Sequence, residues 1–159
     1  MKSGDVNLGG VVELMAIPVE SYLRVRHDRG TGYKFLEVKN RENIIVMPAE
    51  RENKVIWEET QEQAEGGELW TQKVSGVLPS ADTLNTSLME RLMRGRWLVL
   101  TKSANGCVRL SGQPDVPMKF SSQGTSGEGT AGLNGRSFTF ECAAPAPSLV
   151  IRLERLEDI

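Results

Sequence analysis

One segment of the chain has the periodicity of an amphipathic helix, and it lies between two segments that favour strands. Leu84, Leu88 and Leu92 recur at every fourth position of residues 83–94, so a helix places them on one face. Gly95 follows directly, and glycine commonly ends a helix because it adopts positive φ without strain. The pattern favours folds in which a single helix covers a β-rich body.

Most of the remaining chain consists of short β-favouring runs separated by turn residues. Residues 69–78 alternate imperfectly between apolar and polar, residues 97–101 are almost continuously apolar, and residues 137–141 alternate strictly. An Asn-Gly pair at 105–106 lies between two such runs and predicts a β-hairpin, since both residues tolerate positive φ. The other runs expected to be extended are 11–19, 22–25, 33–38, 44–47, 54–58, 107–110, 116–121 and 149–156.

These patterns predict one mainly β domain of the α+β class that covers residues 1–159. Its expected architecture is an antiparallel β-sandwich or barrel with one flanking amphipathic helix near 83–94. Two stretches are expected to be flexible loops. Residues 58–67 hold several glutamates and no basic residue and end in two glycines, and residues 123–136 contain five glycines.

Composition limits the classes of partner. The net charge is −2 with acidic and basic residues interleaved, so the chain lacks the basic stripe of a duplex-coating protein, although a small basic patch stays open. No run approaches 18 apolar residues, and Glu13 and Pro18 interrupt the apolar N-terminal stretch, so neither a membrane span nor a signal peptide is expected. We expect a cytoplasmic protein in which Cys107 and Cys142 are reduced and buried, with a disulfide as the open alternative.

The sequence contains no residue pattern typical of catalysis or metal binding. His27 is its only histidine, and the polar neighbours predict an exposed position beside a turn. The glycine-rich stretch 124–129 lacks the Gly-Lys-Ser/Thr ending and the following helix of a phosphate-binding loop. Acidic pairs such as Glu58 and Glu59 lie in polar surroundings rather than the apolar pocket of a carboxylate general acid. The expectation is therefore no catalytic, cofactor-binding or metal site.

A series of consecutive segments carries a resemblance to known proteins. The segments are a strand at 70–78, a helix at 84–93, an apolar strand at 97–100, a hairpin at 104–106, the Leu-x-Gly-x-Pro-Asp run within 110–118, and the Asn-x-x-x-Phe-x-Phe strand at 134–140. Taken together, residues 69–141 resemble small structural proteins of phages and prophages of the Bacteroides group, of the tail-tube-like or head–tail connection type. The resemblance implies self-association into a ring, packing against neighbouring virion proteins, and no cofactor.

Three functions from different classes follow. The leading hypothesis is a non-enzymatic structural subunit, cytoplasmic before assembly and then part of a virion, whose partners are copies of itself and neighbouring phage structural proteins, without nucleic-acid specificity or a membrane. The alternative is a β-barrel or sandwich module that binds a peptide or carbohydrate through its loops, for which Trp57, Trp70 or Trp97 would cluster on a concave surface. The third is a small hydrolase that uses two carboxylates in an apolar pocket.

Overall fold

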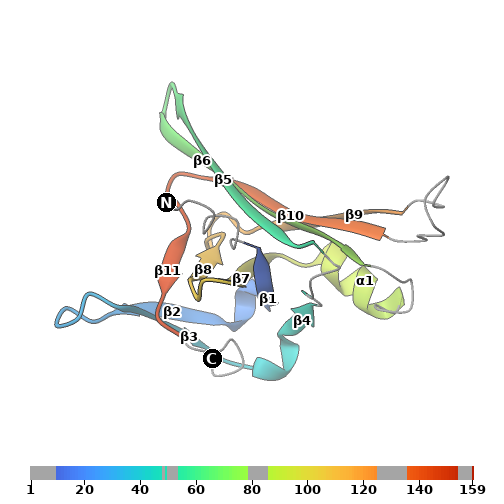
Figure 1. Cartoon of the computed structure of the whole chain (residues 1–159), viewed down its shortest axis with the longest axis horizontal. Helices are drawn as coiled ribbons and strands as arrows, with labels where there is room; N and C mark the ends of the chain where they lie inside the picture. The colour runs from blue at the N-terminus through green and yellow to red at the C-terminus, as the bar shows by residue number, and fades with distance from the viewer. Residues whose placement is uncertain (1–9, 48, 50–53, 79–85, 125–135, 154–158) are drawn as a thin grey trace.

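Two antiparallel sheets and a β-hairpin are stacked in three layers, with one helix at the flank (Figure 1). The computed structural model describes residues 10–47, 49, 54–78, 86–124, 136–153 and 159. Its elements are β1 (Val11–Pro18), a 3-10 turn (Val19–Ser21), β2 (Tyr22–His27), β3 (Lys34–Val38), a 3-10 turn (Arg41–Asn43), β4 (Ile45–Met47), β5 (Ile56–Ala64), β6 (Gly67–Leu78), α1 (Thr86–Arg94), β7 (Trp97–Ser103), β8 (Val108–Ser111), β9 (Lys119–Gly124), β10 (Arg136–Ala144) and β11 (Leu149–Ile151).

The order of strands defines an open sandwich. One sheet has the order β11-β8-β7-β1-β4, the second has the order β5-β6-β10-β9, and β2 pairs with β3 alone. All of these pairings are antiparallel, and neither sheet closes on itself. The predicted mainly β fold with one flanking helix is confirmed, and of the two predicted architectures the sandwich is the one that matches.

The middle of the five-stranded sheet, where β1 and β7 lie side by side, is buried on both of its faces. On β1, Leu14 and Ala16 face the four-stranded sheet, whereas Met15 and Ile17 face the β2–β3 hairpin. Residues 97–100 of β7 divide between the two clusters in the same alternating way. A strand that is covered on both faces needs apolar residues at every position, which explains why these two segments are continuously apolar in the sequence.

The four-stranded sheet is covered on one face only. Phe138 and Phe140 on β10 are buried and alternate with exposed or half-buried neighbours. Phe120 of β9 joins them, with its ring centroid 5.1 Å from that of Phe140. Helix α1 closes the end of this core, where Leu92 is fully buried and the Trp97 indole nitrogen donates to the Leu92 carbonyl at 2.9 Å. The helix is confirmed over Thr86–Arg94, and the predicted start of the helix with Leu84 lies outside the described residues.

The predicted flexible loop at 58–67 is wrong. These residues belong to β5 and β6, whose pairing continues to Ala64 opposite Gly67, so that only Glu65 and Gly66 form the turn. The φ of Gly67 is +124°, which explains the need for glycine at this end of the turn. These residues resemble a loop in composition because the end of the hairpin is exposed on both faces. Its strands therefore lack the alternation of apolar and polar residues that would mark them in the sequence.

The predicted flexible loop at 123–136 lies largely outside the described residues, which omit 125–135. Its two ends belong to strands, since β9 ends at Gly124 and β10 begins at Arg136. The imperfect alternation of residues 69–78 does not reflect a bulge at Gly76, because the β6–β10 register runs through this residue without a shift. Gly76 instead lies directly beneath an aromatic ring: a Cβ there would be 2.9 Å from Cζ of Phe138. The predicted hairpin at 104–106 is confirmed between β7 and β8, with Gly106 at φ +91°.

Candidate interaction surfaces

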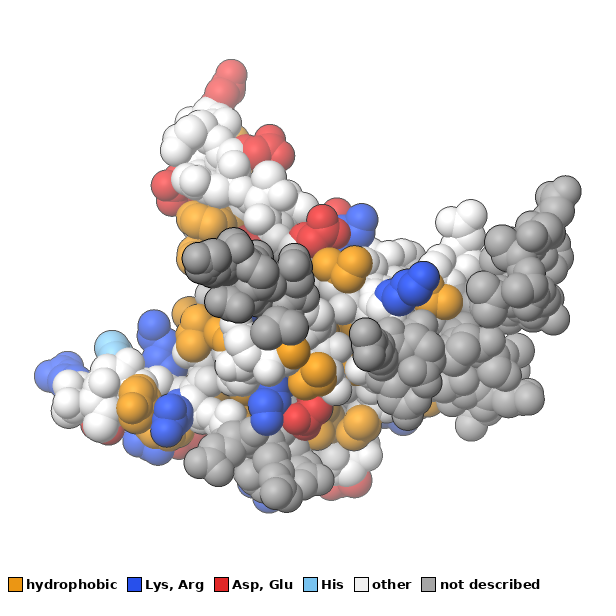
Figure 2. All heavy atoms as spheres, viewed as in Figure 1, with side chains coloured by type: hydrophobic (Ala, Val, Ile, Leu, Met, Phe, Trp, Pro, Cys, Tyr) orange, Lys and Arg blue, Asp and Glu red, His pale blue; other side chains and the backbone are white. Residues whose placement is uncertain are grey.

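The far end of the β5–β6 hairpin projects from the sandwich as an extended ribbon (Figure 1). We call residues 60–68 the acidic arm. Every one of them is exposed, and Glu62, Glu65 and Glu68 are its only charged residues. Acidic side chains are visible along this ribbon in Figure 2. The arm therefore presents carboxylates and backbone to the surroundings without covering any apolar core.

The root of the arm is fixed by contacts with the neighbouring sheet. The indole nitrogen of Trp57 donates to Oγ of Ser111 at 3.1 Å, and the Arg109 guanidinium lies 4.2 Å from the centroid of a Trp57 ring. The carboxylate of Glu59 accepts from the backbone N–H of Ser148 at 2.7 Å. A two-stranded ribbon is only marginally stable alone, so these root contacts are needed to hold it in a defined direction.

A buried amide ties the two sheets together near the same root. Gln72 of β6 is fully buried, and its Oε1 accepts from the backbone N–H of Gly112 at 2.7 Å. Its Nε2 donates to the carbonyl of Ala146 at 2.8 Å, in the connector before β11. The sequence patterns above did not predict a role for Gln72, although a signal exists. Gln72 alternates with Trp70 and Val74 along the strand, so its side chain lies on the inward face, where a polar group needs partners.

The β2–β3 hairpin carries charge of the opposite sign. Residues 22–39 include five basic and two acidic residues, and blue side chains gather on this hairpin in Figure 2. Glu37 accepts from Nε of Arg24 at 2.8 Å and of Arg26 at 3.2 Å. These bonds hold the pKa of Glu37 below its usual 4.5, so the stabilisation they give is present above that pH and is lost as the pH falls through the lowered value.

The tip of the same hairpin is ordered by Asp28. Its carboxylate accepts from Oγ1 of Thr31 at 2.8 Å and from the backbone N–H of Gly30 at 3.1 Å. The hydrogen bond from Thr31, followed by that from Gly30, lowers the pKa of Asp28. His27, at the end of β2, is exposed as predicted.

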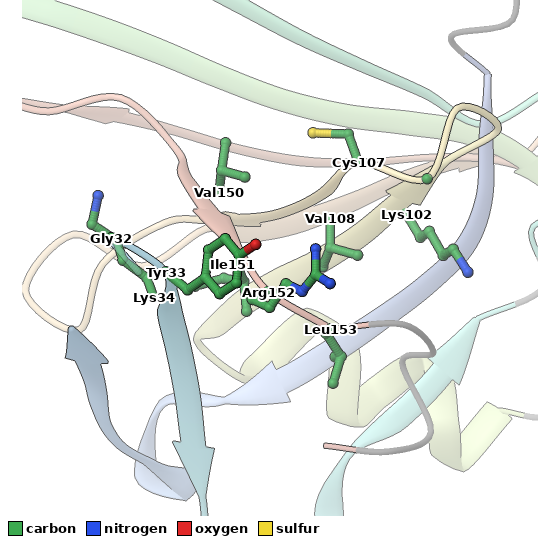
Figure 3. A pocket seen from close by; sticks show the side chains of 11 residues that line it. Gly32, Tyr33, Lys34, Lys102, Cys107, Val108, Val150, Ile151, Arg152 and Leu153 are labelled. Carbon is green, nitrogen blue, oxygen red and sulfur yellow. The ribbon is translucent and has the colours of Figure 1, made fainter. Parts of the chain in front are cut away.

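An open groove of about 520 Å³ lies between this hairpin, the β7–β8 turn and β11 (Figure 3). We call it the basic groove, because Lys34, Lys102 and Arg152 line it. The Arg152 guanidinium lies 4.7 Å from the centroid of the Tyr33 ring, and Nζ of Lys102 lies 3.5 Å from a carboxylate oxygen of Glu13. Its three cationic residues are far apart in the sequence and meet only through the fold, so no local pattern could have predicted the groove.

The two cysteines are free, and they differ in environment. Cys107 is half-buried at the rim of the basic groove, whereas Cys142 is buried on β10. Burial raises the pKa of the Cys142 thiol to about 11, with smaller contributions from the carboxylates of Glu141 and Glu59. Both cysteines are free, as the sequence predicts. The predicted burial is confirmed for Cys142 and is wrong for Cys107, which lies at a turn and is half-buried.

Labelling with a thiol reagent under native conditions is expected to modify Cys107 and to spare Cys142. At pH 8 a thiol with a pKa of about 11 is ionised to only about one part in a thousand, and burial further blocks the reagent. Ellman's reagent should therefore titrate one thiol in the folded protein and both in guanidinium. The Cys107→Ser variant should show no rapid phase, and fast modification of Cys142 in that variant would contradict the assigned burial.

The three tryptophans do not cluster as exposed side chains on the groove. Trp97 is 3% exposed, while Trp57 and Trp70 are partly buried, and Tyr33 is the aromatic residue of the basic groove. No three His, Cys, Asp or Glu side chains of the described residues are grouped so that they could hold a metal ion. Among the described residues, no helix is long and apolar enough to cross a membrane.

Comparison with known proteins adds no relative. No protein-family model matches the chain, and no curated protein and no solved structure matches it. The acidic arm, the basic groove and the sandwich between them are therefore the observations from which a function is proposed.

Proposed function

We propose that the chain is a non-enzymatic structural subunit of a phage-derived virion or tail assembly, which forms homo-oligomeric rings and packs on neighbouring virion proteins. The acidic arm is the observation that carries the proposal. It is an ordered ribbon of nine residues, all exposed, at the end of a hairpin whose root is firmly held. A projecting ribbon of this kind is suited to reach a neighbouring subunit.

Open sheet edges support the same function. Strands β5 and β9 end one sheet, and β11 and β4 end the other. Edge strands carry unpaired backbone donors and acceptors, and a protein that works alone has to protect them from pairing with other chains. In a ring, each edge can be covered by the adjacent copy, so the edges become contact surfaces.

The resemblance of residues 69–141 to phage structural proteins is the second support for the proposal. Strand β6, helix α1, strand β7 and the β7–β8 hairpin occur in the order that the resemblance requires. In this proposal the chain acts without a cofactor, resides in the cytoplasm before assembly and ends in the particle. Its partners are further copies of itself and the adjacent virion proteins.

Self-association is tested by size-exclusion chromatography with light scattering over a concentration series, followed by negative-stain microscopy. We expect the measured mass to rise with concentration and ring-shaped particles to appear at low salt. Co-expression with the proteins that the neighbouring genes encode should promote assembly. A strict monomer under all of these conditions, without particles, would refute the proposal, and specific binding of a monomer to a peptide or glycan would favour the binding-module alternative.

A further inference from the structure

We propose that the acidic arm of one copy docks in the basic groove of the next copy. The inference rests on the proposed self-association and names the two surfaces that carry it. The contact is head-to-tail, since one subunit contributes the arm and its neighbour contributes the groove. Contacts of this type produce rings when the rotation closes and filaments when it does not.

Charge complementarity selects a second copy as the occupant. Glu62, Glu65 and Glu68 face no basic residue within the arm, and the nearest lysine along either strand is Lys73 of β6, opposite Glu58 at the root. The basic groove gathers Lys34, Arg152 and Lys102 around an open floor, and of these Lys102 also pairs with Glu13 of the same chain at 3.5 Å. Opposite surface potentials on two patches of one molecule favour pairing between copies and disfavour pairing of either patch with itself.

The shapes of the two surfaces are compatible. The end of the arm consists of Ala64, Glu65, Gly66 and Gly67, so the carboxylate is the only long side chain at the turn. A β-ribbon without bulky side chains is narrow, with strands about 4.8 Å apart. The groove is open rather than enclosed and has both apolar walls, such as Val150, and cationic groups, so a narrow polar turn can enter it.

The arm and the groove belong to different layers of the molecule. The arm extends from the four-stranded sheet, whereas the groove lies where β3 meets β11 of the five-stranded sheet. The backbone N–H of Arg152 donates to the carbonyl of Lys34 at 2.8 Å, which joins the two walls of the groove. In Figure 1 the arm and the β2–β3 hairpin point in different directions, so one copy can present both surfaces at once.

Complementary charge reversal tests the contact. The arm variant carries Glu62→Lys, Glu65→Lys and Glu68→Lys, and the groove variant carries Lys34→Glu and Arg152→Glu. Each variant alone then presents two surfaces of like charge, so we expect its self-association to weaken by about tenfold or more at low salt. An equimolar mixture of the two restores opposite charges at every contact, so assemblies that contain both variants should form.

A matched control and a folding check accompany the variants. The double variant Arg94→Glu/Arg96→Glu reverses two exposed charges in and just after α1, away from the arm, the groove and the edge strands, and should assemble as the wild type does. Circular dichroism and the melting temperature of each variant show whether it is folded. Wild-type association should weaken as salt rises from about 0.05 to 0.5 M, because exposed charges are screened.

The possible outcomes separate this inference from the proposed function. If the wild type assembles and the arm and groove variants assemble equally well, the contact is wrong and the structural role stands. If both variants are folded and their mixture does not assemble, the contact is also wrong. A wild type that never assembles removes the structural role and the contact together. A groove variant that assembles normally and loses binding to heparin would assign the groove to a foreign polyanion.

A disulfide trap gives an independent measurement. Glu65→Cys in a Cys107→Ser background places one accessible thiol on the arm, and the wild-type chain retains Cys107 at the rim of the groove. With glutathione disulfide as the oxidant, two thiols form one intermolecular disulfide while the oxidant is reduced to two glutathiones. We expect the mixed dimer to form faster than with Ser137→Cys/Cys107→Ser, whose thiol lies at the exposed position 137 of β10. Equal rates would count against docking.

Discussion

Replacement of Phe140 by alanine is expected to lower the free energy of unfolding by about 3–5 kcal/mol. Phe140 is fully buried at the centre of three phenylalanine rings, with centroid distances of 5.1 Å to Phe120 and 6.0 Å to Phe138. The smaller side chain loses the transfer free energy of the ring and leaves a cavity that rigid β-sheets cannot fill by collapsing. Since domains are stable by only about 5–15 kcal/mol, this one change removes a large share of the total.

Urea unfolding followed by tryptophan fluorescence measures the loss. The matched control is Met93→Ala on α1, where the side chain is 61% exposed and the change should stay within about 0.5 kcal/mol. Because Phe140 belongs to the core cluster that both sheets share, the same cavity would reduce contact between the two sheets. An equal, small effect for both variants would show that the phenylalanine cluster does not stabilise the sandwich.

Replacement of Gln72 by leucine is expected to lower the free energy of unfolding by about 2–4 kcal/mol, although leucine is apolar and of similar size. The change leaves the buried N–H of Gly112 without its 2.7 Å acceptor and the carbonyl of Ala146 without its 2.8 Å donor. A buried polar group that loses its partner costs about 1–3 kcal/mol. Here one substitution removes the acceptor of the buried Gly112 N–H and the donor of the part-buried Ala146 carbonyl.

The control for Gln72 is the same substitution in the acidic arm. Gln61→Leu replaces an exposed glutamine of β5 that donates to Glu68 at 2.8 Å, so its effect on global stability should be small. Hydrogen exchange adds a local readout, because the amide of Gly112 should exchange faster in Gln72→Leu than in the wild type. If Gln72→Leu were as stable as Gln61→Leu, the amide would not be the link between the sheets.

The sequence was sufficient to predict the fold class because its signals were local. The leucine stripe, the Asn-Gly turn and the alternating phenylalanines each depend on a few adjacent residues, and each marks an element that the structure contains. The continuously apolar runs of β1 and β7 could not say which sheet would be buried on both faces. That depends on the β2–β3 hairpin folding back over the central sheet, which is a long-range event.

The two candidate surfaces could not be predicted from local sequence patterns, and the reason differs between them. The acidic arm has the composition of a loop, and only its pairing with β6 and the contacts of Trp57 at its root make it a ribbon. The basic groove depends on Lys34, Lys102 and Arg152 from three separate strands or strand ends. Charges that are interleaved along the chain are thus separated in space into an acidic and a basic surface.

The place of β1 in the five-stranded sheet has a consequence for how the chain folds. This first strand lies between β7 and β4 (Figure 1), and Met15 pairs with Leu100, a partner more than half of the chain length away. Contacts between residues so distant in sequence slow folding, because a long stretch must be ordered before they can form. During synthesis β1 therefore emerges early, and its pairing with β7, the middle strand of the sheet, forms only when more than half of the protein has been made.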